Sequence, residues 1–120
     1  MRTIALTAAA VTVLGACASS PAPTERLASS EAALRSAHEL GAENVPRAAL
    51  HLKIAKEELA RARQLIVDGD NQRADYTLAR AQADAEAALA LAREESARSE
   101  AEKALIEVQK LKNSRPEGGS

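Results

Sequence analysis

The fold is decided by residues 46–92, which read PRAALHLKIAKEELARARQLIVDGDNQRADYTLARAQADAEAALALA. Small and apolar residues recur in this stretch at alternating spacings of three and four, the period of one face of an α-helix. One such seam is Val45, Ala48, Leu52, Ala55, Leu59, Ala62 and Ile66, and the other is Ala74, Leu78, Ala81, Ala85, Ala88 and Ala92. Between the seams, Asp68-Gly69-Asp70 combines a helix-ending glycine with a helix-capping aspartate. We therefore expect two antiparallel helices joined by a tight turn.

On the N-terminal side of this hairpin, residues 25–40 predict a further helix. Its stripe has the same spacing and consists of Leu27, Ser30, Leu34, Ala37 and Gly41. Thr24 suits the N-cap, and Gly41 suits the left-handed position that follows a helix. Pro46 is favourable in the first turn of the next helix, over 46–67. We expect the first helix to pack into the groove of the hairpin and complete a three-helix bundle.

The third helix is expected over 71–112, because no proline or glycine interrupts residues 72–112. Forty residues of α-helix would be roughly 60 Å long. The seam slips through the polar stretch 93–100, which is compatible with a bend or with the end of the bundle. Beyond the slip, the chain offers a coiled-coil-like face, whose apolar positions are Ala101, Leu105, Val108 and Leu111. This face predicts a protein partner or self-association, with a frayed helix end as the alternative, and residues 113–120 are expected to be a disordered tail.

The composition limits what such a bundle can do. Alanine accounts for 29 of the 120 residues, so few large side chains remain for a core with a deep pocket. Alanine does, however, have the best intrinsic helix propensity. The net charge is −1, Phe and Trp are absent, and there is one Tyr, so the chain lacks the basic and aromatic surface of nucleic-acid binders. We expect an all-α protein with no nucleic-acid partner.

The sequence shows no constellation typical of catalysis. No serine stands in a glycine-bounded nucleophile turn, and no glycine-rich loop could cradle phosphate. His38 and His51 flank the first connection and, with Glu39 or Glu43, could conceivably bind a metal. Each histidine lies beside the apolar seam, where a flanking role is the simpler interpretation. We expect no enzyme activity, no catalytic residue, no metal and no cofactor.

The N-terminus has the layout of a secretory signal peptide over residues 1–16. Arg2 precedes an uncharged stretch of 13 residues, Ile4–Ala16, which would reach only about 20 Å as a helix and cannot span a bilayer. Residues 14–17, Leu-Gly-Ala-Cys, resemble a bacterial lipobox. That resemblance implies cleavage between Ala16 and Cys17. The alternatives are an ordinary peptidase site nearby and an uncleaved anchor, which the short length of the stretch disfavours. Residues 17–24 would then form the lipidated cysteine and a flexible Pro/Ser-rich tether.

The lipobox resemblance also implies a covalent modification of Cys17 and a cellular location. The thiol would receive a diacylglyceryl group and the freed amine an acyl chain such as palmitate, which together anchor a protein stably. This modification would consume the only thiol of the chain. The residue after the cysteine is Ala18 rather than an aspartate that retains lipoproteins in the inner membrane. The expected location is therefore the outer membrane, on its periplasmic side.

Several short motifs in residues 25–92 resemble the Ala-rich bacterial envelope domain known as domain of unknown function 4398. They are residues 37–43 (Ala-His-Glu-Leu-Gly-Ala-Glu), Pro46-x-x-Ala, Leu59-Ala60-x-Ala62, Gly69-Asp70 and Arg73-Ala74. The resemblance implies a secreted or lipid-anchored helical protein with no established activity. Some members carry a downstream OmpA-like peptidoglycan-binding domain. None follows here, so peptidoglycan binding is not expected.

These observations predict a structural or adaptor lipoprotein without enzyme activity. The alternative is an accessory or chaperone-like binding module of an envelope assembly. A metal protein that uses His38 and His51 is a remote third possibility.

Overall fold

The computed structural model describes residues 20–114, and every regular element in that range is helical. The elements are α1 (Thr24–Glu39), a short 3-10 helix η1 (Ala42–Asn44), α2 (Pro46–Val67) and α3 (Asn71–Ser114). This order confirms the all-α fold with a long C-terminal helix. The expected signal peptide, Cys17 and most of the expected tail lie outside the described residues. Two residues assigned to that tail, Asn113 and Ser114, instead belong to α3.

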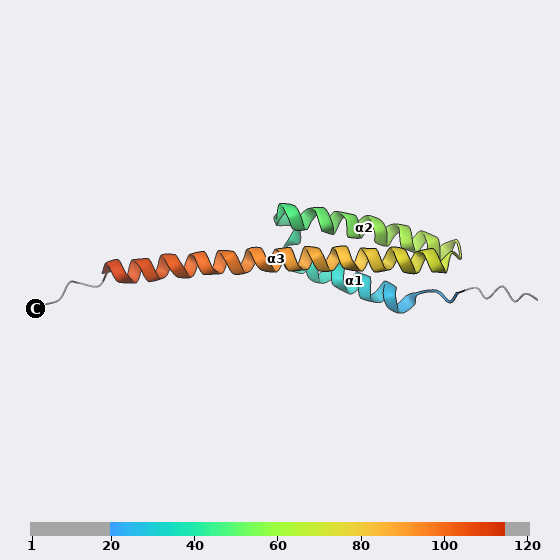
Figure 1. Cartoon of the computed structure of the whole chain (residues 1–120), viewed down its shortest axis with the longest axis horizontal. Coiled ribbons are helices and arrows are strands. Elements are labelled where there is room, and N and C mark those ends of the chain that lie inside the picture. Colours follow the sequence, from blue (N-terminus) through green and yellow to red (C-terminus); the bar gives the residue numbers. More distant parts are fainter. Residues whose placement is uncertain (1–19, 115–120) are drawn as a thin grey trace, which may run out of the picture.

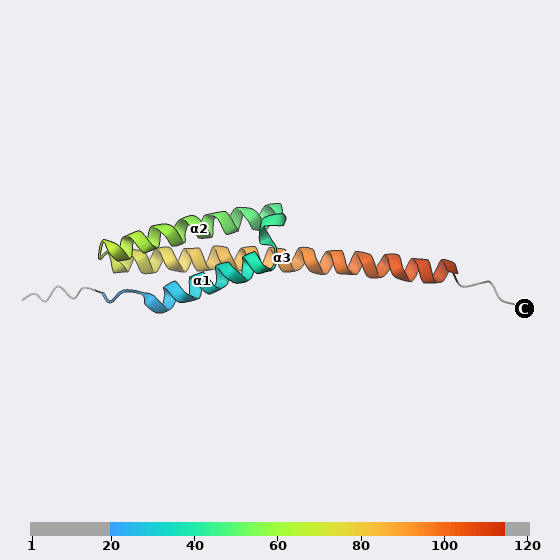
Figure 2. The same ribbon diagram turned by 180° about the vertical axis from the view of Figure 1, so that it is seen from behind.

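The long helix α3 is the centre of the molecule, and the two shorter helices lie against its first half (Figure 1). In both views α2 runs back along α3, while α1 follows α3 on another side (Figure 2). Both helices pack mainly on α3 and touch each other less. The second half of α3 continues alone, so the bundle covers only one end of this helix.

The core consists mainly of alanine with a few leucines, as the two seams predict except at the ends of the first seam: Val45 and Ile66 are only partly buried, and Leu65 is buried in place of Ile66. The buried hydrophobic residues of α2 are Ala48, Leu52, Ala55, Leu59, Ala62 and Leu65, and those of α3 are Ala74, Leu78, Ala81, Ala85, Ala88 and Ala92. Leu78 is the largest side chain that is fully buried. Because an alanine seam leaves little volume between helix axes, the helices can approach closely.

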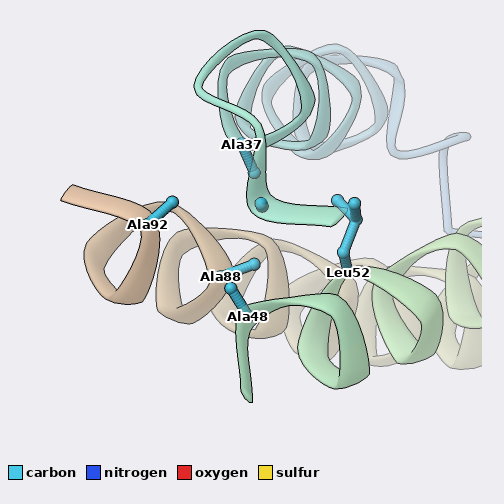
Figure 3. Packing of buried hydrophobic residues seen from close by; sticks show 6 residues of the cluster. Ala37, Ala48, Leu52, Ala88 and Ala92 are labelled. Carbon is cyan, nitrogen blue, oxygen red and sulfur yellow. The ribbon is translucent and has the colours of Figure 1, made fainter. Parts of the chain in front are cut away.

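The buried residues form two clusters along the bundle. One cluster joins the end of α1, η1 and the start of α2 to the middle of α3, and its members are Ala37, Ala42, Ala48, Leu52, Ala88 and Ala92 (Figure 3). The other contains Leu59, Ala62, Leu78 and Ala81, closer to the α2–α3 turn. Leu34 of α1 packs against both clusters. The first cluster fixes the point at which α3 leaves the bundle.

The ends of the helices follow the sequence signals, with one exception at the start of α1. Gly41 and Gly69 take positive φ angles of 75° and 78°, the left-handed conformation that glycine adopts without a steric penalty. The Asp70 carboxylate accepts a hydrogen bond from the backbone N–H of Arg73 at 3.3 Å, as a capping residue should. The prediction for Thr24 is wrong, because Thr24 is already helical and Pro23 precedes α1 without a side-chain cap.

Candidate partner-binding surface

The helix α3 passes without interruption through the polar stretch 93–100, which the sequence left open as a possible bend. Ala92 is its last buried residue. Among residues 93–114 none is buried, and only Ser99 is partly covered. At 1.5 Å per residue this segment, which we call the extension, is about 33 Å long. The slip in the seam therefore marks the end of the bundle rather than the end of the helix.

The extension exposes four large apolar side chains. Leu105, Ile106, Val108 and Leu111 are 68%, 56%, 48% and 61% exposed. Leu105, Val108 and Leu111 belong to the predicted face, together with Ala101, which is exposed as well. Ile106 was not singled out from the sequence, because it falls outside the three-four spacing of that face. A helix with this much uncovered apolar surface has the character of an interaction site.

The apolar residues of the extension do not continue the buried seam. We define the distal stripe as Ala97, Ala101, Ala104, Val108 and Leu111, with Leu105 at its edge. At 100° per residue, the stripe lies roughly 150° around the helix from the seam that faces α1 and α2. Ile106 lies on the other side, closer to the direction of the seam. A partner on the distal stripe would therefore approach α3 from the side away from the bundle.

Ion pairs between neighbouring helices fix the alignment of the helices within the bundle. Arg26 of α1 lies 2.6 Å from Asp75 of α3. Arg63 of α2 likewise lies 2.7 Å from Glu31 of α1. In the third pair, Arg80 of α3 lies 2.6 Å from Glu58 of α2, whose side chain is only 12% exposed. The amphipathic pattern alone predicted outward-facing charges, but these six bridge neighbouring helices.

A buried hydroxyl also ties α1 to α3. Ser30 is 1% exposed, and its Oγ lies 2.8 Å from the Arg26 carbonyl and 3.0 Å from the Leu78 carbonyl. The single hydroxyl hydrogen can serve either acceptor, one in its own helix and one across the interface. Small size placed Ser30 on the predicted stripe, but the contact across to α3 could not be read from its spacing.

The two histidines have separate partners. His51 Nδ1 lies 2.7 Å from Asp84 Oδ1 and links α2 to α3, whereas His38 Nε2 lies 3.8 Å from Glu43 Oε1 beside the α1–η1 connection. Within residues 20–114, no three His, Cys, Asp or Glu side chains gather closely enough to hold a metal ion. The described chain thus offers the remote metal hypothesis no set of ligands. Cys17, the predicted lipidation site, lies outside it.

The residues just before α1 are held against the start of α3. The Asn71 side-chain amide donates a hydrogen bond to the Ser20 carbonyl at 2.6 Å, and the Thr24 N–H donates to the Ala22 carbonyl at 2.8 Å. Residues 20–26 and the first turns of α3 line an open surface groove of about 670 Å³. The chain therefore enters the bundle beside the α2–α3 turn, at the end opposite to Ser114 (Figure 1).

Comparisons with known proteins identify a family but no characterised relative. In the part of the chain that the structure covers, no helix is both long and apolar enough to cross a membrane. Residues 25–104 match the family model described as Domain of unknown function (DUF4398). No curated protein and no solved structure matches the chain.

Proposed function

The chain belongs to the family described as Domain of unknown function (DUF4398), and from this premise we propose that it is a non-enzymatic lipoprotein of the cell envelope. In this proposal the bundle is an adaptor that holds one end of α3, and the extension presents the distal stripe to another protein. In this proposal the protein acts by binding another protein through α3, close to the membrane in which the lipid anchor is inserted.

The observation that carries the proposal is the length of α3 beyond its bundle. Half of a 44-residue helix has no covering element, yet it stays helical and keeps apolar side chains at three-four spacing. The extension continues a helix that is already nucleated in the bundle, so its helicity does not require an apolar stripe and does not explain the exposed Leu105, Val108 and Leu111. Burial against a partner would remove these apolar side chains from water.

The anchor is proposed from the N-terminal sequence. Leu14-Gly15-Ala16-Cys17 follows an uncharged stretch behind Arg2, in the order that a lipoprotein signal requires. The acylated Cys17 would then sit in the outer membrane on its periplasmic side, consistent with Ala18 in the following position. Two or more acyl chains make such attachment stable.

Absence of catalysis is part of the proposal and is supported by how the polar groups are used. The bundle interior is lined by alanine and leucine, and the Ser30 hydroxyl lies within hydrogen-bonding distance of two backbone carbonyls. Glu58, Asp75 and Asp84 each face a basic residue of another helix or a histidine. These groups stabilise helix packing, and we assign them no role as acids, bases or nucleophiles.

The anchor and the partner are tested separately. For the anchor, we expect Cys17→Ser to move the protein from the membrane fraction to the soluble fraction, with loss of incorporated fatty acid. A membrane-bound, unacylated Cys17→Ser protein would contradict the anchor.

For the partner, a photo-crosslinking residue at Leu105 should capture a discrete protein in vivo. The same residue at Ala60, exposed on the bundle, is the matched control. Equal capture at both positions, or none at Leu105, would contradict a partner on the extension.

A further inference from the structure

We propose that the distal stripe binds a second copy of this chain, in parallel orientation, as a short two-helix coiled coil. The inference rests on the proposed function, because attachment of both copies to one membrane brings the extensions together. It names the partner of the extension, which the proposed function leaves open.

The distal stripe has the geometry of a coiled-coil interface. Its spacing of four, three, four and three from Ala97 to Leu111 is that of alternating d and a positions in a coiled coil. Ala97, Ala101 and Ala104 would let two helices approach closely, and Val108 and Leu111 would form the larger layers. Since the stripe lies roughly 150° from the buried seam, α1 and α2 of each copy would face outward and leave the contact free.

The charged residues that flank the distal stripe complement those of a second copy in a parallel pair. In a parallel pair, a g position lies beside the e position five residues further along the other chain. Glu107 and Lys112 occupy such positions, and symmetry makes the contact twice. Arg93 and Arg98 also form such a pair, but Glu94 lies 3.2 Å from Arg98 in the same chain and offsets that repulsion.

The antiparallel arrangement is disfavoured by the same positions. There, g faces g and e faces e: one antiparallel register brings Glu100 beside Glu107, and the register one heptad along brings Arg98 beside Lys112. These like-charge contacts oppose the longer-range attraction between the acidic first half and the basic second half of the extension. Contact charges act within a few ångströms, whereas charges more than about 8 Å apart are largely screened at physiological salt.

In a parallel pair, the lipid anchors of both copies would also lie at the same end of the dimer. The Asn71–Ser20 hydrogen bond places the entry of the chain at the α2–α3 turn, so both copies of a parallel pair would present that end to the same surface. A stripe of about two heptads is too short for tight association in free solution. Confinement to one membrane raises the effective concentration and makes a weak contact sufficient.

Disulfide trapping in vesicles tests the pairing directly. Full-length lipidated protein carrying Val108→Cys should form a covalent dimer, because residue 108 would face its own copy across the axis. The matched control is Ile106→Cys, also exposed and apolar, which lies outside the stripe and should not cross-link. Equal cross-linking at the two positions, or none at 108 in membrane-bound protein, overturns the proposal.

Charge reversal tests the orientation. Glu107→Lys and Lys112→Glu, each added to Val108→Cys, should lower the yield of cross-linked dimer about fivefold, the order expected when flanking ion pairs become repulsive. The double reversal should restore the yield, because the charges face each other again. Failure of the double reversal to restore the yield overturns the parallel register.

The unlipidated Cys17→Ser chain separates this inference from the proposed function. At high protein concentration it should still cross-link through residue 108, since the contact lies in α3. Loss of membrane attachment with retained cross-linking leaves the pairing intact. Membrane attachment of the wild-type anchor without cross-linking overturns the pairing and leaves the anchor intact.

Discussion

At the scale of single residues, alanine sets the distance between α3 and its neighbours. Within residues 20–114, ten of the fourteen buried hydrophobic residues are alanines, and several are completely inaccessible to solvent. A methyl group contributes little apolar area, so these positions stabilise the bundle by permitting close contact rather than by filling space. Any larger side chain at such a position must push two backbones apart.

Ala85→Leu should therefore destabilise the bundle by about 1–3 kcal/mol, the usual effect of overpacking. Ala85 is fully buried, whereas Ala83 is an exposed alanine two residues away on the same helix. Ala83→Leu is the matched control and should change the free energy of unfolding by less than about 0.5 kcal/mol. Urea denaturation followed by circular dichroism measures both. Equal effects would show that α3 is not packed through its alanine seam.

Glu58, the partner of Arg80, is the most covered carboxylate among the charged contacts between helices. Its side chain is 12% exposed, and Glu58 Oε2 has no hydrogen-bond partner. Arg80→Ala would leave this carboxylate without its cation, at a cost of about 1–2 kcal/mol. Arg98→Ala removes the exposed partner of Glu94 outside the bundle and should cost less than about 0.5 kcal/mol. Denaturation midpoints that shift equally in the two variants would contradict this difference.

At the scale of elements, α3 is one continuous helix with two environments. Its first half is stabilised by packing against α1 and α2, and its second half only by propensity and local pairs such as Glu94–Arg98. The distal stripe also faces a different direction from the buried seam. The two halves can therefore be altered independently.

Removal of the extension should leave the bundle nearly as stable as before. A stop after Glu95 deletes no buried residue of the described range, which ends at residue 114, so the midpoint of thermal unfolding should change by less than about 3 °C. Mean residue ellipticity at 222 nm should reflect loss of roughly five turns of helix. A large fall in the midpoint would show that the extension folds back on the bundle or supports it through self-association. Comparison of dilute and concentrated protein separates these two causes.

The seams of α2 and α3 could be predicted almost residue by residue, because small residues at three-four spacing have no other simple explanation. Continuity through 93–100 could not, since a polar slip fits a bend and a straight helix equally well. The contacts of Ser30 and Arg63 depend on how the helices are rotated about each other, which spacing within one helix does not fix. The sequence pattern does not predict a role for Ile106, because this residue lies outside the stripe that defines the candidate face.

At the scale of the whole molecule, the described chain has two different ends. Residues 20–23 meet α3 at the α2–α3 turn, where Asn71 holds the Ser20 carbonyl. The distal stripe lies toward the opposite end of α3 (Figure 2). Ser20 is the third residue after the proposed lipid site at Cys17, so the chain between them spans at most about 11 Å. Because the proposed anchor lies near the α2–α3 turn and α3 leads away from that turn, we predict that the extension projects away from the membrane.

This orientation predicts a distance difference along α3 in lipidated protein bound to vesicles. A dye on Gln72→Cys should be quenched strongly by acceptors in the lipid headgroups, and a dye on Lys112→Cys weakly, because about 60 Å of helix separates the two positions. Asn71→Ala removes the hydrogen bond to Ser20, frees the entry segment and should reduce the difference. Equal quenching at both positions in the parent protein would mean that α3 lies along the surface. The distal stripe would then be available to the bilayer rather than to a partner standing away from it.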